Sequence, residues 1–390
     1  MLKILFIIDH LGQGGAQKML YYLSTGLVKK MNYQVVVVSL QKRNMYSGWF
    51  EKAGIKVIHC GIDIQGSPLE TSSFVKTLFF SGWKMFLSFI KLLKLVAEFK
   101  PNVISTFLFG ADFFGTAAGL FTRTKVVCAI RATNIWKRWW HKLASRLTYP
   151  FVSCFTVNST RTAIYLNKKE GVPLSKIKCI FNGVDLKRPI VDCAAVREMY
   201  EVPDSVFWVV AVGRLDEQKG FEYLIQAAES LKNSGISFVL SIFGEGHLRA
   251  LLENQIKALN LEAYVRLEGY AGDLKPVLLS ADMFVLSSLY EGMPNVILEA
   301  MSMGLPIVAA DVDGVCDIIT HEKDGLMVQT KNPEDLYAAL YRLCGDKDLR
   351  KKMSENGYER VKRNFSIESM CRQYHDLYQL VIADVAGITF

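Results

Sequence analysis

Residues 283–299 read Met-Phe-Val-Leu-Ser-Ser-Leu-Tyr-Glu-Gly-Met-Pro-Asn-Val-Ile-Leu-Glu, an apolar run followed by a glycine, a proline and two carboxylates eight positions apart. The apolar run 283–286 predicts a buried strand, and Pro294 suits the first position of a helix, which needs no N–H donor. The stretch therefore predicts a strand, a tight loop that contains Glu291, and a helix that contains Glu299. The free N–H groups at the start of such a helix attract anions.

An anion site between two carboxylates favours a ligand with phosphate in its middle and hydroxyl groups at both ends. We therefore interpret residues 283–299 as part of a nucleotide-sugar site. The structural alternative is simpler: Glu291 is an exposed loop acid and Glu299 is a solvated helix acid.

The length and composition favour a cytosolic protein of two domains. At 390 residues, of which 51% are hydrophobic, the chain is long enough for two cores. The sequence contains no run of about 18 uncharged apolar residues, so we expect no membrane-spanning helix. The first residues predict a buried strand rather than a signal peptide. The eight cysteines form no Cys-x-x-Cys pair, which favours reduced thiols, and no cluster of His, Cys and Asp has metal-ligand spacing.

The net charge of +8 is distributed unevenly along the chain. Residues 1–190 contain 27 Lys and Arg against 8 Asp and Glu, a net of +19, whereas residues 191–390 contain 19 against 30, a net of −11. The basic half is expected to face an anionic partner, and the candidates are nucleic acid and an anionic membrane surface.

Continuous apolar runs alternate with amphipathic stretches along both halves. In the first half, strands are expected at residues 4–8, 34–40, 56–59, 103–107, 125–130 and 151–157. In the second half they are expected at residues 207–212, 238–243, 264–268, 283–286, 307–310 and 326–328. This alternation predicts parallel sheets covered by helices on both faces.

The fold class is therefore α/β, with two Rossmann-like, doubly wound domains at residues 1–181 and 182–365. A seam rich in turn residues, 182–205, separates their cores. Because ligands of such sheets bind at the carboxyl ends of the strands, we expect the site in a cleft across which the two domains face each other.

Two loops that follow predicted strands have the residues of a phosphate site. Gly12, Gly14 and Gly15 follow the first strand, where glycine lets the backbone approach a phosphate, although the spacing is not a dinucleotide fingerprint and an ordinary turn is an equal alternative. Arg214 and Lys219 stand in the loop after residue 212, where an arginine and a lysine can bind a diphosphate.

The alternative for this second loop is that both cations pair with Asp216 and Glu217 at the surface. Gly244-Glu245-Gly246 forms a further turn at a strand end in the same domain. That turn either lines a pocket or is only a turn.

These motifs together resemble the retaining glycosyltransferases of family 4, which have the GT-B fold of two Rossmann-like domains. The match covers most of residues 205–335, through Gly-Arg-Leu and Gln-Lys-Gly at 213–220, Phe-Gly-Glu-Gly-His-Leu-Arg at 243–249, Glu-x7-Glu at 291–299, and the Ala-Met, Gly and Pro-Ile-Val-Ala pattern at 300–309. The first half matches more loosely, through Gly-Gly-Ala-Gln at 14–17. The resemblance also implies a last helix, at residues 366–390, that crosses back to the first domain.

The resemblance implies roles for individual residues. Arg214, Lys219 and Glu291 form the catalytic set, in which the two cations hold the donor diphosphate and Glu291 contacts the donor sugar, while Glu299 binds the ribose. No metal or cofactor is expected, because the two cations neutralise the diphosphate. The expected donor-binding residues are Gly14, Gly15, Gly213, Arg214, Lys219, Gly244, Gly292, Met293, Pro294, Asn295 and Glu299.

The sequence departs from the family in one respect. Many members have a histidine near the strand at 103–107, and this chain has none there. We expect Ser105 or Asp112 to contact the substrate instead, and His10, beside the glycine loop, is a further candidate for the acceptor side.

Two segments of the basic half are typical of a membrane surface. Residues 83–98 gather Lys84, Lys91 and Lys94 on one face of an otherwise apolar helix, although a buried Rossmann helix shows the same pattern. The second segment mixes indoles with cations, which suits lipid headgroups or single-stranded nucleic acid, and the donor-site motifs favour lipid. Its residues are Trp136, Lys137, Arg138, Trp139 and Trp140.

We interpret the sequence as a retaining hexosyltransferase that moves a sugar from a nucleotide sugar, with UDP as the expected nucleotide, to a membrane-held, lipid-linked saccharide acceptor in cell-surface glycan synthesis. The protein is expected to be cytoplasmic, peripheral on the inner face of an anionic cell membrane, with no nucleic-acid partner. One alternative is a non-hydrolysing sugar-nucleotide epimerase, which needs an acid/base pair that the sequence does not show convincingly. The other is a basic membrane-binding or nucleic-acid-binding module without catalysis.

Overall fold

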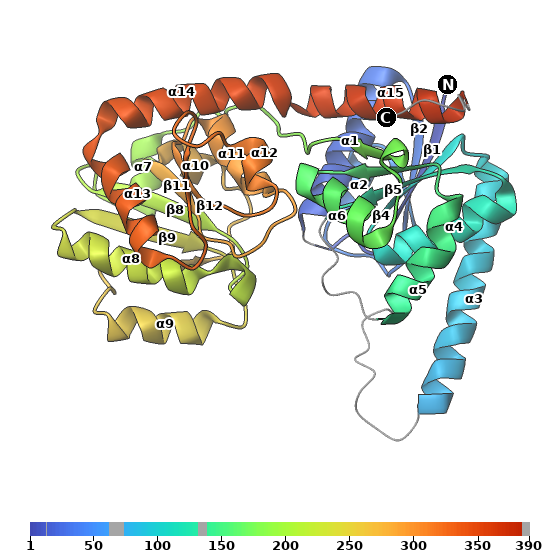
Figure 1. Cartoon of the computed structure of the whole chain (residues 1–390), viewed down its shortest axis with the longest axis horizontal. Helices are drawn as coiled ribbons and strands as arrows, with labels where there is room; N and C mark the ends of the chain where they lie inside the picture. Colours follow the sequence, from blue (N-terminus) through green and yellow to red (C-terminus); the bar gives the residue numbers. More distant parts are fainter. Residues whose placement is uncertain (13, 62–73, 132–138, 384–390) are drawn as a thin grey trace. The chain divides into compact units, whose positions relative to one another are not determined.

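The computed structural model describes residues 1–12, 14–61, 74–131 and 139–383, with the side chains of residues 74–84, 139 and 140 excepted. The chain divides into two compact units. The first unit comprises Met1–Asn182 and Ile367–Phe390, and the second comprises Gly183–Ser366 (Figure 1).

The first unit is built on a seven-stranded parallel sheet with the strand order β3-β2-β1-β4-β5-β6-β7. Its strands are β1 (Lys3–Ile8), β2 (Gln34–Ser39), β3 (Lys56–His59), β4 (Val103–Phe107), β5 (Lys125–Ile130), β6 (Cys154–Val157) and β7 (Ile177–Cys179). Its helices are α1 (Gly15–Met31), α2 (Ser47–Lys52), α3 (Phe74–Phe99), α4 (Phe109–Thr122), α5 (Trp139–Thr148), α6 (Thr160–Glu170) and α15 (Ile367–Ile382), with the 3-10 turns η1 (Tyr149–Phe151) and η2 (Leu174–Lys176).

The second unit is built on a six-stranded parallel sheet with the order β10-β9-β8-β11-β12-β13. Its strands are β8 (Phe207–Val212), β9 (Phe238–Phe243), β10 (Val265–Gly269), β11 (Met283–Leu286), β12 (Ile307–Ala310) and β13 (Leu326–Val328). Its helices are α7 (Cys193–Met199), α8 (Phe221–Asn233), α9 (Arg249–Ala258), α10 (Lys275–Ser280), α11 (Asn295–Met303), α12 (Val315–Ile318), α13 (Pro333–Gly345) and α14 (Lys347–Asn364), with the 3-10 turn η3 (Glu217–Lys219).

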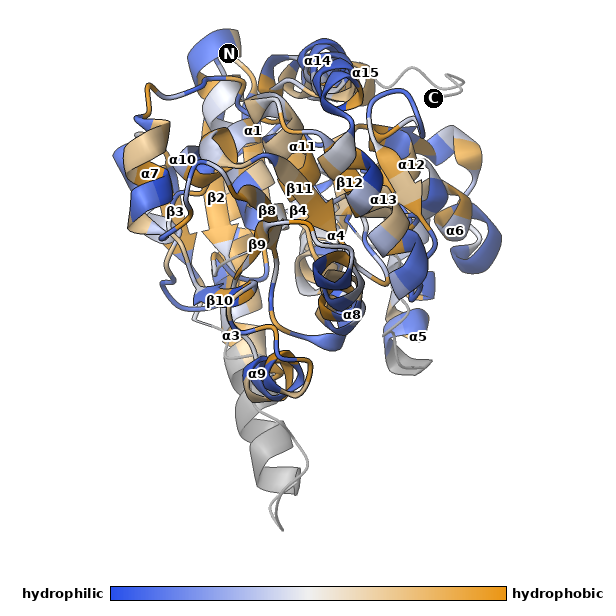
Figure 2. Cartoon of the chain, turned by 90° about the vertical axis from the view of Figure 1, so that its left-hand side faces the viewer, coloured by the Kyte–Doolittle hydropathy of each residue, from blue (hydrophilic) through white to orange (hydrophobic). Residues whose placement is uncertain are grey.

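The predicted fold of two parallel-sheet α/β domains is confirmed, because every strand pair in both sheets is parallel. Figure 2 shows the strands in the hydrophobic colour and the outer helix α14 in the hydrophilic colour. The central strands are also almost fully buried, as continuous apolar runs predict for sheets covered on both faces.

Three local expectations were wrong. The strand expected at 151–157 begins only at Cys154, because Tyr149–Phe151 form the 3-10 turn η1 around Pro150. Strand β7 was not expected, since its run Ile-Lys-Cys is short and partly polar. Helix α11 begins at Asn295, so Pro294 is the capping residue before the helix rather than its first residue.

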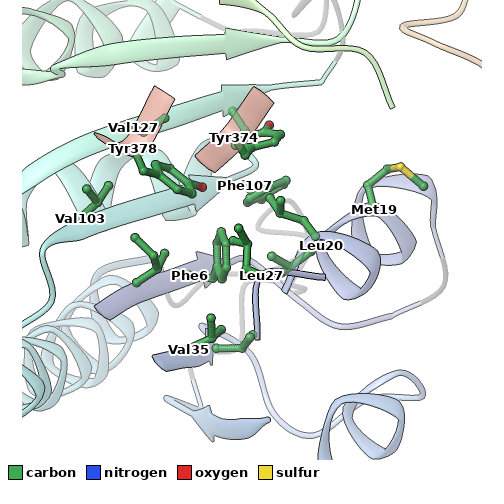
Figure 3. Packing of buried hydrophobic residues seen from close by; sticks show 14 of the residues in the cluster. Phe6, Met19, Leu20, Leu27, Val35, Val103, Phe107, Val127, Tyr374 and Tyr378 are labelled. Carbon is green, nitrogen blue, oxygen red and sulfur yellow. The ribbon is translucent and has the colours of Figure 1, made fainter. Parts of the chain in front are cut away.

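Helix α15 belongs to the first unit, where it packs against α1 and over the sheet. Figure 3 shows Tyr374 and Tyr378 of this helix among the buried side chains of β1, β4 and β5. Both tyrosine hydroxyls are satisfied: Arg131 Nη2 donates to Tyr374 over 2.6 Å, and Tyr378 donates to Ser105 Oγ over 3.0 Å. These paired polar groups fix where α15 docks.

The order of the strands places one topological switch point in each sheet. In the first unit the switch point lies between β1 and β4, and in the second it lies between β8 and β11. In open α/β sheets, ligands generally bind outside the carboxyl ends of the strands at such a switch point.

Candidate active site

In the second unit, the loops that follow β8 and β11 lie side by side at the switch point. The Leu289 N–H donates to the Gln218 carbonyl over 2.7 Å, and Gln218 Nε2 donates to the Tyr290 carbonyl over 2.9 Å. These hydrogen bonds join two segments that are about 70 positions apart in the sequence and bring the predicted diphosphate loop onto the predicted sugar-binding loop.

The centre of the site is an ion pair between Lys219 and Glu291. Lys219 Nζ lies 2.5 Å from Glu291 Oε1, and the two side chains are only 16% and 10% exposed. Ser288 Oγ donates to the same carboxylate oxygen over 2.8 Å. The Lys219 stem lies against Gly213, where an added Cβ would meet the lysine Cδ at 2.8 Å. A charged pair this well buried needs such hydrogen bonds to offset its desolvation.

Arg214 takes part in a different arrangement. Its Nε lies 2.6 Å from Asp216 Oδ2, and its side chain is 70% exposed. The pairing with Asp216 that the sequence offered as an alternative therefore occurs for Arg214, whereas Lys219 pairs with Glu291. Glu217 pairs with His247 over 3.1 Å. The Arg214 guanidinium is thus anchored at one edge while the rest of it faces solvent.

Close backbone contacts make glycine necessary at two positions around this pair. Gly244 has φ 147°, and a Cβ there would lie 1.8 Å from the Gly213 carbonyl oxygen. Gly314 has φ 77°, and a Cβ there would lie 2.0 Å from the Gly292 carbonyl oxygen. Gly314 was missed in the sequence, because only the fold brings the loop after β12 against residues 292 and 293.

The N-terminus of α11 lies next to the two loops, where an anion site was expected. Pro294 precedes it with φ −75° and ψ 101°, and no acidic residue occupies its first turn. Met293 is buried, whereas Asn295 and Glu299 are half-buried. The structure therefore gathers a cationic loop, a helix N-terminus and two carboxylates, which together can bind a diphosphate flanked by hydroxyl groups.

At the switch point of the first unit lie the glycine loop and His10. His10 Nδ1 accepts the Gly12 N–H over 3.1 Å and lies 3.4 Å from Gln17 Nε2, and burial lowers the pKa of this imidazole. Gly14 caps α1, and Gly15 is its first residue. The expected donor-binding residues are thus divided between the two units.

Next to His10, the half-buried carboxylate of Asp9 caps α4. Asp9 accepts the N–H groups of Gly110 over 3.2 Å and of Ala111 over 2.5 Å. Burial raises the pKa of Asp9 to about 6 despite these hydrogen bonds. Asp9 was not selected from the sequence, because a single acid after a strand carries no signal of its own.

Ser105 and Asp112 do not lie where a substrate contact was expected, and this expectation is corrected. Ser105 is fully buried in β4 and accepts a hydrogen bond from Tyr378 of α15. Asp112 is 6% exposed and accepts a hydrogen bond from Thr106 Oγ1 over 2.5 Å. Both are interior polar groups satisfied by neighbouring side chains, as buried polar groups generally are.

The aromatic and basic segment lies mostly outside the described residues. Trp136, Lys137 and Arg138 lie outside the described residues, and Trp139 and Trp140 begin α5 without described side chains. Helices α3, α4 and α5 are neighbours in the first unit (Figure 1). They carry large apolar side chains at high exposure, among them Phe86 at 53%, Phe121 at 71% and Leu147 at 63%.

Among the described residues, no group of three or more His, Cys, Asp and Glu is arranged to hold a metal ion. An Asp-x-Asp pair, Asp311 and Asp313, does occur in the loop between β12 and α12, directly before Gly314. Cys316 Sγ donates to Asp311 Oδ1 over 3.0 Å. The described helices also include none that is long and apolar enough to cross a membrane.

Both units are similar to known protein families. The family model Glycosyltransferase Family 4 matches residues 13–188, and the model Glycosyl transferases group 1 matches residues 195–360. Over 306 residues, covering 75% of this chain and 78% of that protein, the chain is 29% identical to the UDP-Gal:alpha-D-GlcNAc-diphosphoundecaprenol alpha-1,3-galactosyltransferase of Escherichia coli. Four relatives that are 32–34% identical are matched over about half of their own length.

Two further similarities span nearly the whole chain. Over 367 residues, covering 93% of this chain and 94% of that protein, it is 25% identical to the GalNAc-alpha-(1->4)-GalNAc-alpha-(1->3)-diNAcBac-PP-undecaprenol alpha-1,4-N-acetyl-D-galactosaminyltransferase of Campylobacter jejuni. The crystal structure of Anabaena HepE in complex with UDP shares the fold with a TM-score of 0.82 at 19% identity, covering 97% of this chain and 100% of that one. The protein therefore belongs to the glycosyltransferases with the GT-B fold, with a first domain of the family 4 type and a second domain of the group 1 type.

Proposed function

We propose that this glycosyltransferase is a retaining enzyme that moves a hexose-type sugar from a UDP-sugar to a saccharide held on a polyprenyl diphosphate. The observation that carries the proposal is the Lys219–Glu291 pair beside the N-terminus of α11, at the switch point of the second unit. The printed names of the Escherichia coli and Campylobacter jejuni relatives, both of which include an undecaprenol-linked acceptor, support the class of acceptor.

Different residues of the site bind different parts of the donor. Lys219 and Arg214 neutralise the diphosphate, together with the backbone N–H groups of the loop before α11 other than Pro294, which has none. Glu291 accepts hydrogen bonds from the sugar, and Glu299 accepts them from the ribose. The bond between the sugar C1 and the diphosphate oxygen breaks, and a bond from C1 to the acceptor oxygen forms on the same face. The acceptor proton passes to the departing diphosphate, so no protein nucleophile is assigned.

A transfer assay tests this proposal. The protein is incubated with a panel of UDP-sugars, with and without a polyprenyl-diphosphate saccharide, and products are separated by mass. We expect release of UDP and growth of the glycolipid by one sugar, only when both substrates are present. Conversion of one UDP-sugar into its epimer without acceptor would instead identify an epimerase. If the protein neither turned over any UDP-sugar nor bound UDP, it would be a binding module without catalysis.

The reaction is expected to proceed without a divalent metal. Arg214 and Lys219 supply the positive charge that a metal would otherwise bring to the leaving diphosphate. Activity in excess EDTA should therefore equal activity in added Mg²⁺. If EDTA abolished activity and Mn²⁺ or Mg²⁺ restored it, this expectation would be contradicted. Asp311 and Asp313 would then be the first candidates for metal ligands.

We further propose that α3, α4 and α5 dock on an anionic membrane surface, on the cytoplasmic face where the acceptor would be held. Exposed apolar side chains on these helices lie among the exposed cations Lys91, Lys94, Lys142 and Arg146. The charge of residues 1–190, +19, adds a long-range attraction to anionic lipid. Apolar side chains and cations together are what an interfacial surface needs.

The membrane proposal predicts sedimentation with phosphatidylglycerol vesicles and weak sedimentation with neutral ones. Replacing Phe86, Ile90 and Phe121 by serine should reduce sedimentation at least several-fold, because each buried apolar side chain contributes about 1.5–3 kcal/mol. High salt should release part of the wild-type protein, since the screening length falls to about 3 Å at 1 M.

The matched control carries serine at Met199, Leu251 and Tyr341, which are 75%, 54% and 47% exposed in the second unit. This control should sediment like wild type. If it loses binding to the same degree, or if the first variant sediments like wild type, the three helices are not the membrane surface.

A further inference from the structure

Two adjacent serines after β11 contact the charged pair, and neither was selected from the sequence. Ser287 and Ser288 are 3% and 0% exposed. Ser287 Oγ donates to the Lys219 main-chain carbonyl over 2.8 Å, and Ser288 Oγ donates to Glu291 Oε1 over 2.8 Å. The two hydroxyls therefore act on different members of the same ion pair.

The hydrogen bonds leave the two oxygens of the Glu291 carboxylate unequal. Oε1 receives both the Lys219 ammonium and the Ser288 hydroxyl, whereas Oε2 has no hydrogen-bond partner among the described residues. With one oxygen held by two donors, the carboxylate plane is fixed and Oε2 keeps its lone pairs for another donor. A sugar hydroxyl is a donor of the required kind.

The Ser287 contact has another consequence. Because its hydroxyl holds the main-chain carbonyl at Lys219, it fixes the end of the 3-10 turn η3 from which the lysine side chain starts. Gly220 follows with φ 57°, and a Cβ there would lie 2.5 Å from the Ser287 carbonyl oxygen. The backbone of η3 is thus held against the end of β11 from two directions.

We infer that Ser288 is a positioning residue for recognition of the donor sugar through Glu291, and that Ser287 is a positioning residue for recognition of the diphosphate through Lys219. This division rests on the proposed function of the site, since it assigns the two members of the pair to two parts of the UDP-sugar. Neither serine needs to touch the ligand.

Calorimetric titration of Ser288→Ala and Ser287→Ala with UDP and with UDP-glucose, UDP-galactose and UDP-N-acetylglucosamine tests the inference. For the UDP-sugar that wild type binds more tightly than UDP, Ser288→Ala should lower that preference about tenfold while the UDP affinity stays within about twofold, because a hydrogen bond to a charged group is lost. Ser287→Ala should weaken UDP and the UDP-sugar by the same factor.

Ser280→Ala is the matched control. Ser280 is 6% exposed on α10, and its hydroxyl donates to the Pro276 carbonyl over 2.9 Å, so the variant loses a buried serine hydrogen bond elsewhere in the same unit. It should bind both ligands like wild type. Thermal unfolding of all three variants shows whether each remains folded at the temperature of titration.

The two variants distinguish a positioning role from a merely structural role. If both serines were only structural, the two variants would change the affinities for UDP and for the UDP-sugar in the same way. Equal losses for UDP and UDP-sugar in both variants, or wild-type affinities in both, would overturn the inference. It would also be overturned if wild type bound every UDP-sugar no more tightly than UDP. If wild type bound neither UDP nor any UDP-sugar, the proposed function itself would fail, which is a separate result.

Discussion

Lys219→Ala is expected to weaken UDP binding by about 10- to 100-fold, because a charged hydrogen bond to the diphosphate contributes roughly 1.5–3 kcal/mol. The structure adds a second effect that the sequence did not indicate. Removal of the lysine leaves the Glu291 carboxylate, 10% exposed, without its cation. Breaking a buried ion pair from one side costs about 3 kcal/mol, so the free energy of unfolding should also fall.

Calorimetry with UDP and denaturant unfolding measure the two effects separately. The double variant Lys219→Ala with Glu291→Ala should regain part of the lost stability, because no unpaired carboxylate remains, but it should not regain UDP affinity. Lys351→Ala, which removes an exposed lysine of α14, is the control and should match wild type in both assays. Wild-type UDP affinity in Lys219→Ala would exclude the lysine from the diphosphate site.

Gly314→Ala is expected to lower turnover about a hundredfold, because the new Cβ would lie 2.0 Å from the Gly292 oxygen and 2.9 Å from the Met293 Cα. The backbone before α11 must move to relieve this contact, and a shift of about 1 Å in substrate-binding groups has an effect of this size. The clash should also lower the free energy of unfolding by about 1–3 kcal/mol.

Gly235→Ala is the matched control for this substitution. Gly235 has φ 79°, close to the 77° of Gly314, but a Cβ there would meet nothing within 4 Å. Both variants therefore share the cost of a left-handed alanine, about 1 kcal/mol. Steady-state kinetics should show near wild-type turnover for Gly235→Ala, and equal losses in the two variants would mean that strain in φ, not contact with residues 292–293, is responsible.

The sequence predicted the sheets well because their strands are buried on both faces, so that runs such as 283–286 and 307–310 are continuously apolar. The loops that we propose to bind the donor were selected for a similar local reason, since Arg214, Lys219 and Glu291 belong to motifs that are continuous in the chain. The contact between Lys219 and Glu291 could not be derived locally, because it depends on β8 and β11 being neighbours across the switch point.

The errors have the same physical origin. Ser105 and Asp112 were expected at the substrate because they lie in the region where many family members have a histidine. In the structure Ser105 is instead paired with Tyr378, from a helix at the far end of the chain, and Asp112 of α4 is paired with Thr106 of the preceding strand β4. The role of Gly314 could not be predicted from the sequence either, because the residue that it contacts, Gly292, lies on another loop.

The central claim is that a UDP moiety binds in the second unit between the 213–220 loop and the start of α11. Hydrogen–deuterium exchange of the wild-type protein, with and without saturating UDP, tests this claim most directly. We expect UDP to slow exchange in peptides that cover residues 213–220 and 287–299, and to leave α9 and the groove beside α7, lined by Asp192, Arg197 and Asp204, unchanged. Protection confined to that groove, or to the first unit, with no change at 213–220 and 287–299, would contradict the claim.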